Sequence, residues 1–254
     1  MNSPVADLAG RVALVTGGAG GLGSAICRAL ADAGATVIVG YHRSADAAQA
    51  LASEMRAGGQ AHSALAAPVT DSKALDRLAV DIEHRHGRLD ILINCAGITR
   101  FVPHGDLDAL DDSLIDEILA TNVRGPFAAI RALRGLLARN GDGLVVNISS
   151  IAAVTANGSN VMYCASKAAV DNMTKSLARA LAPALRVVSI APGLVDTEFV
   201  KGLDEQWRQD QVSRTPLARL AAPEEVARAV LAMATHFKFS TGTVFAVDGG
   251  RPLI

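Results

Sequence analysis

The feature that most constrains this chain is a regular alternation of short apolar runs with longer amphipathic segments. The apolar runs have the length of strands and lie at 12–16, 36–40, 60–67, 91–94, 144–149, 186–191 and 243–248, with 60–67 the weakest. The amphipathic segments have helical spacing and lie at 22–33, 45–57, 72–86, 112–121, 126–139, 160–182 and 223–234. This alternation predicts an α/β fold with a doubly wound parallel sheet of about seven strands and helices on both faces.

No linker, repeat or low-complexity tract interrupts the pattern, so we expect one domain over residues 1–254. The segment 193–222 carries no regular pattern and is too long for an ordinary connection, which indicates a substrate-binding loop. Half of the residues are hydrophobic, yet no apolar run is long enough to span a bilayer, so no membrane association is expected.

Charge and cysteine content exclude several other classes of protein. The net charge is −1 and the sequence pI is about 6.6, which gives no sign of nucleic-acid binding. The first ten residues lack the blocks of a signal peptide. Cys27, Cys95 and Cys164 are scattered without metal-ligand spacing, so we expect reduced thiols, no metal site and a cytoplasmic location.

A glycine-rich stretch, TGGAGGLG at 16–23, joins the first apolar run to the first amphipathic segment. One register, starting at Gly18, fits G-x-G-x-x-G, and another, starting at Thr16, fits T-G-x-x-x-G-x-G. A turn of this kind leaves the first N–H groups of the helix free to bind phosphate. It predicts a Rossmann-type dinucleotide site. The expected contacts there come from Gly17, Gly20, Gly21, Leu22 and Gly23.

Further motifs follow along the chain: NCAG at 94–97, TNVRG at 121–125, NISSIAA at 147–153, YCASK at 163–167 and APG at 191–193. Together with the glycine-rich stretch, this ordered set resembles the signature of the short-chain dehydrogenases/reductases, and in particular their 3-oxoacyl-carrier-protein reductase branch. The resemblance covers nearly the whole chain. It implies an NAD(P)-dependent oxidoreductase that transfers a hydride between a nicotinamide and a carbonyl or secondary alcohol.

Tyr163 and Lys167 are four positions apart in a segment with helical spacing, so they are expected to share one helix face. That spacing alone also suits a core tyrosine beside a lysine whose head reaches water. A free tyrosine has a pKa of about 10, and a cation one turn away, with the positive charge of an oxidised nicotinamide nearby, could lower it by stabilising phenolate. The resemblance implies that Tyr163 is the general acid/base and that Lys167 supports it and binds a cofactor ribose.

Two further residues complete the catalytic set that the resemblance implies. Ser150 would polarise the substrate oxygen, and Asn122 would hold a water that links Lys167 to solvent. The neighbouring Ser149 is expected to point to the other side, because side chains alternate along a strand.

The cofactor preference rests on YHRS at 41–44, after the second apolar run. An NAD enzyme of this fold needs an acidic residue there to bond the ribose 2′-OH. That place is taken by Tyr41, and Arg43 can bind a 2′-phosphate with charge-assisted bonds. We therefore expect NADP(H), with NAD(H) as the alternative for a neutral pocket. Many relatives carry Asp-Val beside the adenine where this chain has Pro68 and Val69.

The other cofactor contacts are assigned by the resemblance and by the position of the motifs after strands. They are Tyr41, His42, Arg43, Ser44, Val69, Asn94, Ala96, Gly97, Tyr163, Lys167, Pro192, Gly193, Val195 and Thr197.

The substrate stays open between 3-oxoacyl thioesters and sugars or polyols. A rival interpretation is a non-catalytic dinucleotide-binding redox sensor. The complete set of Asn122, Ser150, Tyr163 and Lys167 argues against it, because a sensor needs only the glycine loop.

Segments 112–139 and 160–182 hold more apolar and small residues than one buried face needs. Because members of the family commonly pair the equivalent helices, we expect a homotetramer.

Overall fold

The computed structural model describes residues 7–55, 61–202 and 204–253. The strands of this part of the chain are β1 (Val12–Thr16), β2 (Thr36–Tyr41), β3 (Ser63–Ala66), β4 (Ile91–Asn94), β5 (Gly143–Ile148), β6 (Leu185–Pro192) and β7 (Val244–Val247). They form one parallel seven-stranded sheet in the order β3-β2-β1-β4-β5-β6-β7. The chain winds outward from β1 in one direction and from β4 in the other. The crevice where β1 and β4 end is therefore the switch point at which doubly wound sheets bind ligands.

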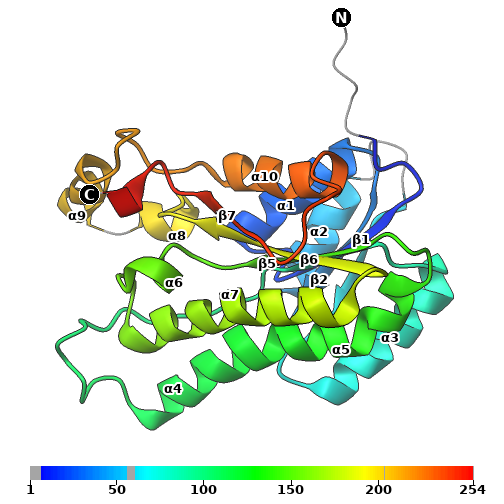
Figure 1. The fold of residues 1–254 in the computed structure, drawn as a ribbon, viewed down its shortest axis with the longest axis horizontal. Coiled ribbons are helices and arrows are strands. Elements are labelled where there is room, and N and C mark those ends of the chain that lie inside the picture. Colours follow the sequence, from blue (N-terminus) through cyan, green and yellow to red (C-terminus); the bar gives the residue numbers. More distant parts are fainter. Residues whose placement is uncertain (1–6, 56–60, 203, 254) are drawn as a thin grey trace, which may run out of the picture.

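Helices cover both faces of the sheet (Figure 1). One face carries α1 (Gly21–Asp32), α2 (Ala45–Met55) and α10 (Pro223–Thr235). The other carries α3 (Ser72–His86), α5 (Gly125–Ala138) and α7 (Val161–Leu181). The predicted fold class is confirmed.

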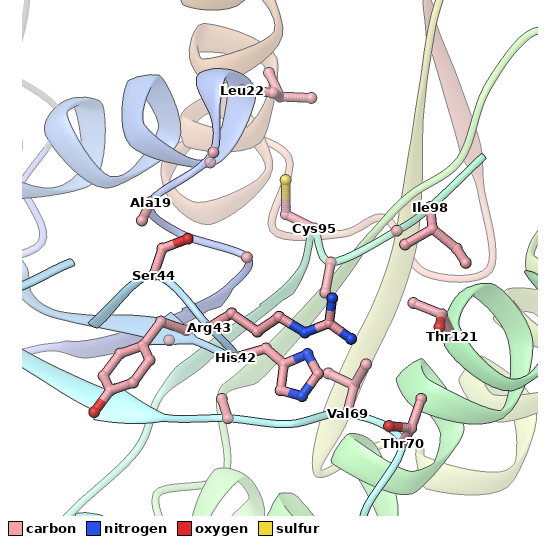
Figure 2. A pocket seen from close by; sticks show the side chains of 18 of the residues that line it. Ala19, Leu22, His42, Arg43, Ser44, Val69, Thr70, Cys95, Ile98 and Thr121 are labelled. Atoms are coloured by element: carbon pink, nitrogen blue, oxygen red, sulfur yellow. The ribbon is translucent and has the colours of Figure 1, made fainter. Parts of the chain in front are cut away.

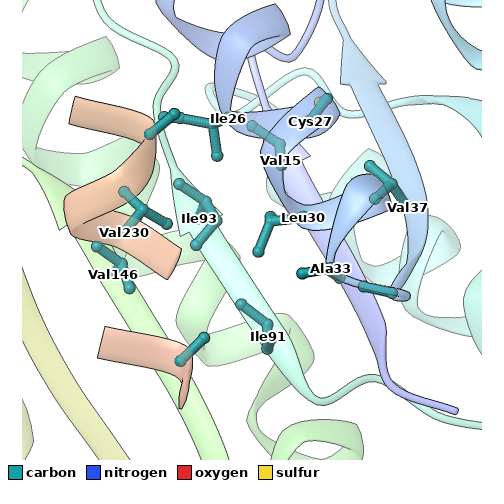
Figure 3. Packing of buried hydrophobic residues seen from close by; sticks show 14 of the residues in the cluster. Val15, Ile26, Cys27, Leu30, Ala33, Val37, Ile91, Ile93, Val146 and Val230 are labelled. Carbon is teal, nitrogen blue, oxygen red and sulfur yellow. The ribbon is translucent and has the colours of Figure 1, made fainter. Parts of the chain in front are cut away.

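The two hydrophobic cores explain why the strands read as unbroken apolar runs. In β1, Ala13 and Val15 belong to the core beneath α1 and α10, whereas Val12 and Leu14 belong to the core on the opposite face. Figure 3 shows the first core, where Leu30 of α1 lies among side chains of the sheet. A strand that is buried on both sides leaves no position for an alternating polar residue.

The predicted strands and helices are all present, with ends shifted by a few residues. Residues 56–57 of the predicted helix 45–57 and residue 60 of the predicted strand 60–67 lie outside the described residues. The predicted helices 112–121 and 126–139 are both present and run on from one another. A π-helical turn at Ala120–Arg124 joins α4 (Asp112–Leu119) directly to α5. Glycine at 125 allows close packing there, since an added Cβ would lie 2.9 Å from the Val69 side chain.

The segment 193–222 is more regular than its sequence pattern indicates. It contains α8 (Glu198–Lys201) and α9 (Glu205–Ser213), and no residue of α9 is buried. A helix without a buried face has no apolar period to detect. Polar contacts hold α9 instead: the Arg251 guanidinium donates to the Gln211 carbonyl at 2.8 Å and to its side-chain oxygen at 3.0 Å.

Asp90 ties the amino ends of β1 and β4 together. Its side chain is 1% exposed and accepts from the Val12 N–H at 2.9 Å. It also accepts two bonds from Arg88, at 2.8 and 2.7 Å, and one from Arg11 at 3.3 Å. Burial raises the pKa of the Asp90 carboxyl, but the bonds from Arg88 and Val12 outweigh burial and leave this pKa below its usual value.

We expect Asp90→Asn to lower the free energy of unfolding by about 1–3 kcal/mol at pH 7, the range for disrupting buried hydrogen bonds to a charged group. A carboxyl with a depressed folded-state pKa stabilises the fold above its unfolded pKa of about 3.9, and this contribution is lost as pH falls through the folded pKa. The difference between wild type and variant, measured by urea denaturation, should therefore close in that acidic range.

The matched control is Asp142→Asn, because Asp142 also pairs with Arg11, at 2.8 Å, but its side chain is 39% exposed. An exposed pair of this kind contributes less than about 1 kcal/mol. Equal losses in the two variants would contradict a special role for Asp90.

Candidate active site

The turn between β1 and α1 has a shape that side chains would disrupt. Gly17 has a φ of +66°, and an added Cβ on Gly23 would lie 2.2 Å from the Gly17 carbonyl oxygen. Gly20 caps α1 without a side-chain hydrogen bond, so the first N–H groups of the helix keep no such partner. The turn therefore presents backbone donors at a helix N-terminus, as a phosphate site requires.

Thr16 brings the segment after β4 against this turn. Its hydroxyl accepts from the Cys95 N–H at 3.1 Å and the Ala96 N–H at 3.2 Å, and it donates to the Ile93 carbonyl at 3.3 Å. The approach is close, since an added Cβ on Gly17 would lie 3.0 Å from the Ala96 Cα. The threonine of the T-G pattern is thus the residue that joins the two loops.

A pocket of about 570 Å³ opens at this switch point (Figure 2). His42 and Arg43 extend from the end of β2 across the pocket toward Val69. Pro68 offers no carboxylate here, and the nearby Asp71 does not replace it, because it caps α3 by accepting from the Ala74 N–H at 3.1 Å. The predicted cofactor residues that line this pocket are Gly17, Gly20, Gly21, Leu22, Gly23, Tyr41, His42, Arg43, Ser44, Val69, Ala96 and Gly97.

The start of α7 positions Tyr163 and Lys167. The Asn160 side chain caps this helix by accepting from the Tyr163 N–H at 2.7 Å. The Lys167 ammonium lies 5.6 Å from the centre of the Tyr163 ring and donates to the Ile148 carbonyl at 2.8 Å. Because Lys167 is only 7% exposed, its head does not reach solvent as it would in the purely structural interpretation.

Burial perturbs both groups. It lowers the pKa of Lys167 to about 8, against the opposing effects of Cys95 and Asp171. It also raises the pKa of Tyr163, and the hydrogen bond with Ser150 offsets this only in part. Lys167 alone therefore does not bring the pKa of Tyr163 below its ordinary value. The ammonium is bonded to a β5 carbonyl and lies beside the ring, so desolvation of the phenol dominates.

Ser149 and Ser150 directly follow β5 and differ in their hydrogen-bond partners. Ser150 hydrogen-bonds with Tyr163 and accepts from the Ala152 N–H at 3.1 Å. The Ser149 hydroxyl donates to the Lys167 carbonyl at 3.4 Å, and both serines line the smaller pocket described below.

Asn122 lies in the π-helical turn and is 1% exposed. Its amide oxygen accepts from the Ile98 N–H at 2.8 Å, and its amide nitrogen donates to the Ile98 carbonyl at 3.0 Å and the Ser166 hydroxyl at 3.2 Å. An added Cβ on Gly97 would lie 3.4 Å from the Asn122 oxygen and 3.8 Å from the Lys167 nitrogen. The side chain of Asn122 therefore holds the loop after β4 beside Lys167.

A second pocket of about 290 Å³ adjoins the first and shares Leu22, Cys95, Gly97 and Ile98 with it. Thr197 borders the glycine turn, since an added Cβ on Gly21 would lie 3.3 Å from the Thr197 Cβ. The predicted residues that line the second pocket are Ser150, Tyr163, Lys167, Pro192, Gly193, Val195 and Thr197.

Asn94 does not line either pocket, although the sequence predicted a cofactor contact. It is buried in β4, where its amide donates to Asn147 at 2.9 Å, and Asn147 in turn donates to Thr174 at 2.8 Å. This buried chain of polar groups links β4, β5 and α7 beneath the site.

Sequence reasoning missed several lining residues, because apolar side chains carry no chemical signature. Ile98, Leu194 and Val200 form much of the wall of the second pocket. Cys95 borders both pockets, and burial raises the pKa of its thiol to about 11. Its position inside the NCAG motif was the available signal.

The described residues hold neither a metal-ligating cluster nor a membrane-spanning helix. They contain no group of three or more His, Cys, Asp or Glu side chains arranged to hold a metal ion. None of the helices in residues 7–55, 61–202 and 204–253 has the length and apolarity to cross a membrane.

The glycine turn opens into a cavity large enough for a dinucleotide, and Tyr163 and Lys167 line the smaller cavity that adjoins it. The protein is accordingly an NAD(P)-dependent oxidoreductase. A family model described as short chain dehydrogenase matches residues 11–208. The chain belongs to the short-chain dehydrogenase/reductase family, and its relatives include 3-oxoacyl-carrier-protein reductases, as its motifs predicted.

Three similar proteins illustrate the range of this family. The 3-oxoacyl-[acyl-carrier-protein] reductase FabG of Thermotoga maritima is 34% identical, with 96% of this chain and 98% of that protein covered. The cis-4-hydroxycyclohexanecarboxylate dehydrogenase of Sinomonas cyclohexanicum is 37% identical, with 94% and 96% covered. The structure of a gluconate 5-dehydrogenase from Burkholderia cenocepacia J2315, in complex with NADP and tartrate, is 30% identical, has a TM-score of 0.91 and covers 98% of each chain.

Proposed function

We propose that this protein is an NADP(H)-dependent reductase or dehydrogenase whose substrate carries a carbonyl or secondary alcohol next to an uncharged, largely apolar group. The observation that carries the proposal is the meeting of Tyr163, Ser150 and Lys167 at the wall of the second pocket, beside the glycine-turn cavity. The nicotinamide supplies or accepts the hydride when it is bound. The side chains of this protein donate or accept the proton that accompanies the hydride.

Tyr163 donates that proton to the carbonyl oxygen during reduction, and Ser150 donates a hydrogen bond to the same oxygen. The raised pKa of Tyr163 suits this direction, because it keeps the phenol protonated. In the reverse direction the phenol must lose its proton, and the Lys167 ammonium then stabilises the phenolate. Asn122 holds the loop beside Lys167, where we expect a water to connect this lysine to solvent.

The second pocket supports a substrate with an apolar flank. Its lining includes Ile98, Leu194 and Val200, and its ionisable side chains within the described residues are Cys95, Tyr163 and Lys167. A pocket without a guanidinium or a surface lysine gives an anionic sugar acid no partner beyond the catalytic lysine. The thioester-like side of the predicted substrate range is therefore favoured over a charged sugar acid, and a neutral sugar or polyol stays the alternative.

The cofactor preference is supported by the end of β2. The 41–44 segment presents no carboxylate to repel a 2′-phosphate, and Arg43 reaches into the pocket as an exposed cation (Figure 2). The similar gluconate 5-dehydrogenase was solved with NADP. A guanidinium grips phosphate through paired, charge-assisted bonds, so we infer that NADP(H) is preferred over NAD(H).

A redox sensor without turnover would need the glycine turn but not the second pocket. Here the tyrosine, serine and lysine converge on that pocket, which favours an enzyme. The two functions are separated by following nicotinamide absorbance with a panel of ketones and alcohols.

Tyr163→Phe should lower kcat by about 10²–10⁴-fold on the best substrate of that panel, because it removes the general acid/base. Cofactor affinity should change little, since the phenol oxygen is not part of the glycine turn. The measurement is steady-state kinetics together with NADPH binding by fluorescence. Lys167→Ala should lose both turnover and affinity, and near-normal kcat in Tyr163→Phe would refute the assignment.

Arg43→Ala should weaken NADP(H) binding by about 1.5–3 kcal/mol, the contribution of hydrogen bonds to a charged group, and leave NAD(H) binding little changed. Fluorescence titration of both cofactors measures this difference. A wild-type enzyme that prefers NAD(H), or equal losses for both cofactors, would contradict the NADP(H) preference.

We infer that the protein is a homotetramer in which α5 and α7 pair with those of another copy. Their outer surfaces expose Phe127 and Val161 together with the small residues Ala165 and Ala168. Light scattering at micromolar concentration should give the mass of a tetramer of 26.2 kDa chains. Ala168→Arg should reduce this mass, whereas Ala50→Arg on the exposed face of α2 should not, and a monomeric wild type would sink the inference.

A further inference from the structure

One buried carboxylate lies next to the catalytic lysine and has no role in the mechanism described above. Asp171 follows Lys167 by one turn of α7, on the same face of the helix. It is 8% exposed, and its Oδ1 atom has no hydrogen-bond partner in the structure. A buried carboxylate that lacks full hydrogen bonding is unfavourable unless a cation stabilises it.

The end of β5 contacts both groups of this pair. The Ile148 carbonyl accepts from the Lys167 ammonium at 2.8 Å. The hydroxyl of the next residue, Ser149, donates to the Lys167 carbonyl at 3.4 Å, and its proximity lowers the pKa of the Asp171 carboxyl. Lys167 is therefore held against this strand end, and Asp171 lies one turn further along the same helix face without forming a direct ion pair with it.

The charges around the pair identify what Asp171 acts on. Burial raises the pKa of the Asp171 carboxyl, and Ser149, Lys175 and Lys167 each oppose this effect, but Lys175 is exposed and its charge is screened by solvent. Lys167 is buried and faces three ionisable groups: Cys95 after β4, and Tyr163 and Asp171 on α7. The thiol and the phenol are neutral near pH 7. Among the groups that face Lys167, only the Asp171 carboxylate supplies a full negative charge there.

We propose that Asp171 is a positioning residue that keeps Lys167 protonated over the working pH range, by holding a carboxylate one turn behind it. This inference rests on the proposed function in one respect, namely that Lys167 acts in its protonated form. Burial already brings the pKa of Lys167 down to about 8, close to neutral pH. Removal of the carboxylate lowers this pKa further, so that a larger fraction of the enzyme loses its cation at pH 7–8.

The test is the pH dependence of NADPH affinity, which requires no turnover. NADPH fluorescence is titrated between pH 7 and pH 10 with the intact protein. Wild-type affinity is expected to fall as Lys167 loses its proton. In Asp171→Asn the midpoint of that fall should move to lower pH by about 0.5–1 pH unit, the size of one charge–charge interaction in a partly buried site.

Two further variants separate charge from packing. Asp171→Val removes the charge without leaving a buried polar group, so it keeps the test open if the asparagine variant fails to fold, and it should give the same shift. Asp171→Glu retains the charge and should restore a midpoint near that of wild type. The control Asp116→Asn, on the exposed side of α4, should leave the midpoint unchanged.

An unmoved midpoint in folded Asp171→Asn and Asp171→Val would overturn the proposal, even if affinity falls at every pH, because a merely structural role lowers affinity without moving the titration. The alkaline limb of kcat/KM for ketone reduction should shift in the same direction and provides a second readout. Failure of the wild type to bind NADPH at all would overturn the proposed function, and this inference with it. Normal binding without turnover on any ketone would count against the function alone.

Discussion

The parallel pairing of β1 with β4 is the contact on which the rest of the site depends. A polar side chain holds each end of this pair. Asp90 accepts from the Val12 N–H at the amino ends of the strands, and Thr16 accepts from the N–H groups of residues 95 and 96 at the carboxyl ends. Between them the strands pair from Ala13 with Ile91 to Thr16 with Asn94. A slip of one residue would turn every core side chain to the wrong face and separate the glycine turn from the NCAG loop. The packing of the core and the position of the glycine turn therefore depend on the same strand register.

The candidate catalytic side chains depend on one helix cap and one π-helical turn. Asn160 starts α7 by capping the Tyr163 N–H, which sets where the tyrosine and the lysine fall around the helix axis. The π-helical turn places Asn122 inward, where its amide takes both backbone groups of Ile98. Such turns often occur at functional sites, because one extra residue re-aims the side chains around it. Neither Asn160 nor Asn122 lines the second pocket, yet the two residues position Tyr163, Lys167 and Ile98, which do.

The sequence predicted the sheet, both helical layers and most lining residues, because glycine turns, apolar runs and the Tyr163–Lys167 spacing are local signals. It did not predict α9, which has no buried face and so no period. It placed Asn94 at the cofactor, whereas pairing across the sheet buries this amide against Asn147. The pKa of Tyr163 was expected to fall, but desolvation depends on packing around the phenol and is invisible in a motif. The burial of Asn94 and the pKa of Tyr163 depend on residues far away in the sequence, so local sequence patterns could not predict them.

The way α9 is held has a consequence for how this enzyme can diversify. No residue of α9 is buried, and the helix is attached through Arg251, through the ion pair of Arg208 with Asp196 at 3.1 Å and through backbone bonds. Changes on the surface of α9 therefore put the sheet at little risk, whereas a change at Thr16 or Asp90 would disturb it. Among the helices of the described residues, α9 is thus one whose exposed positions can vary without loss of the fold.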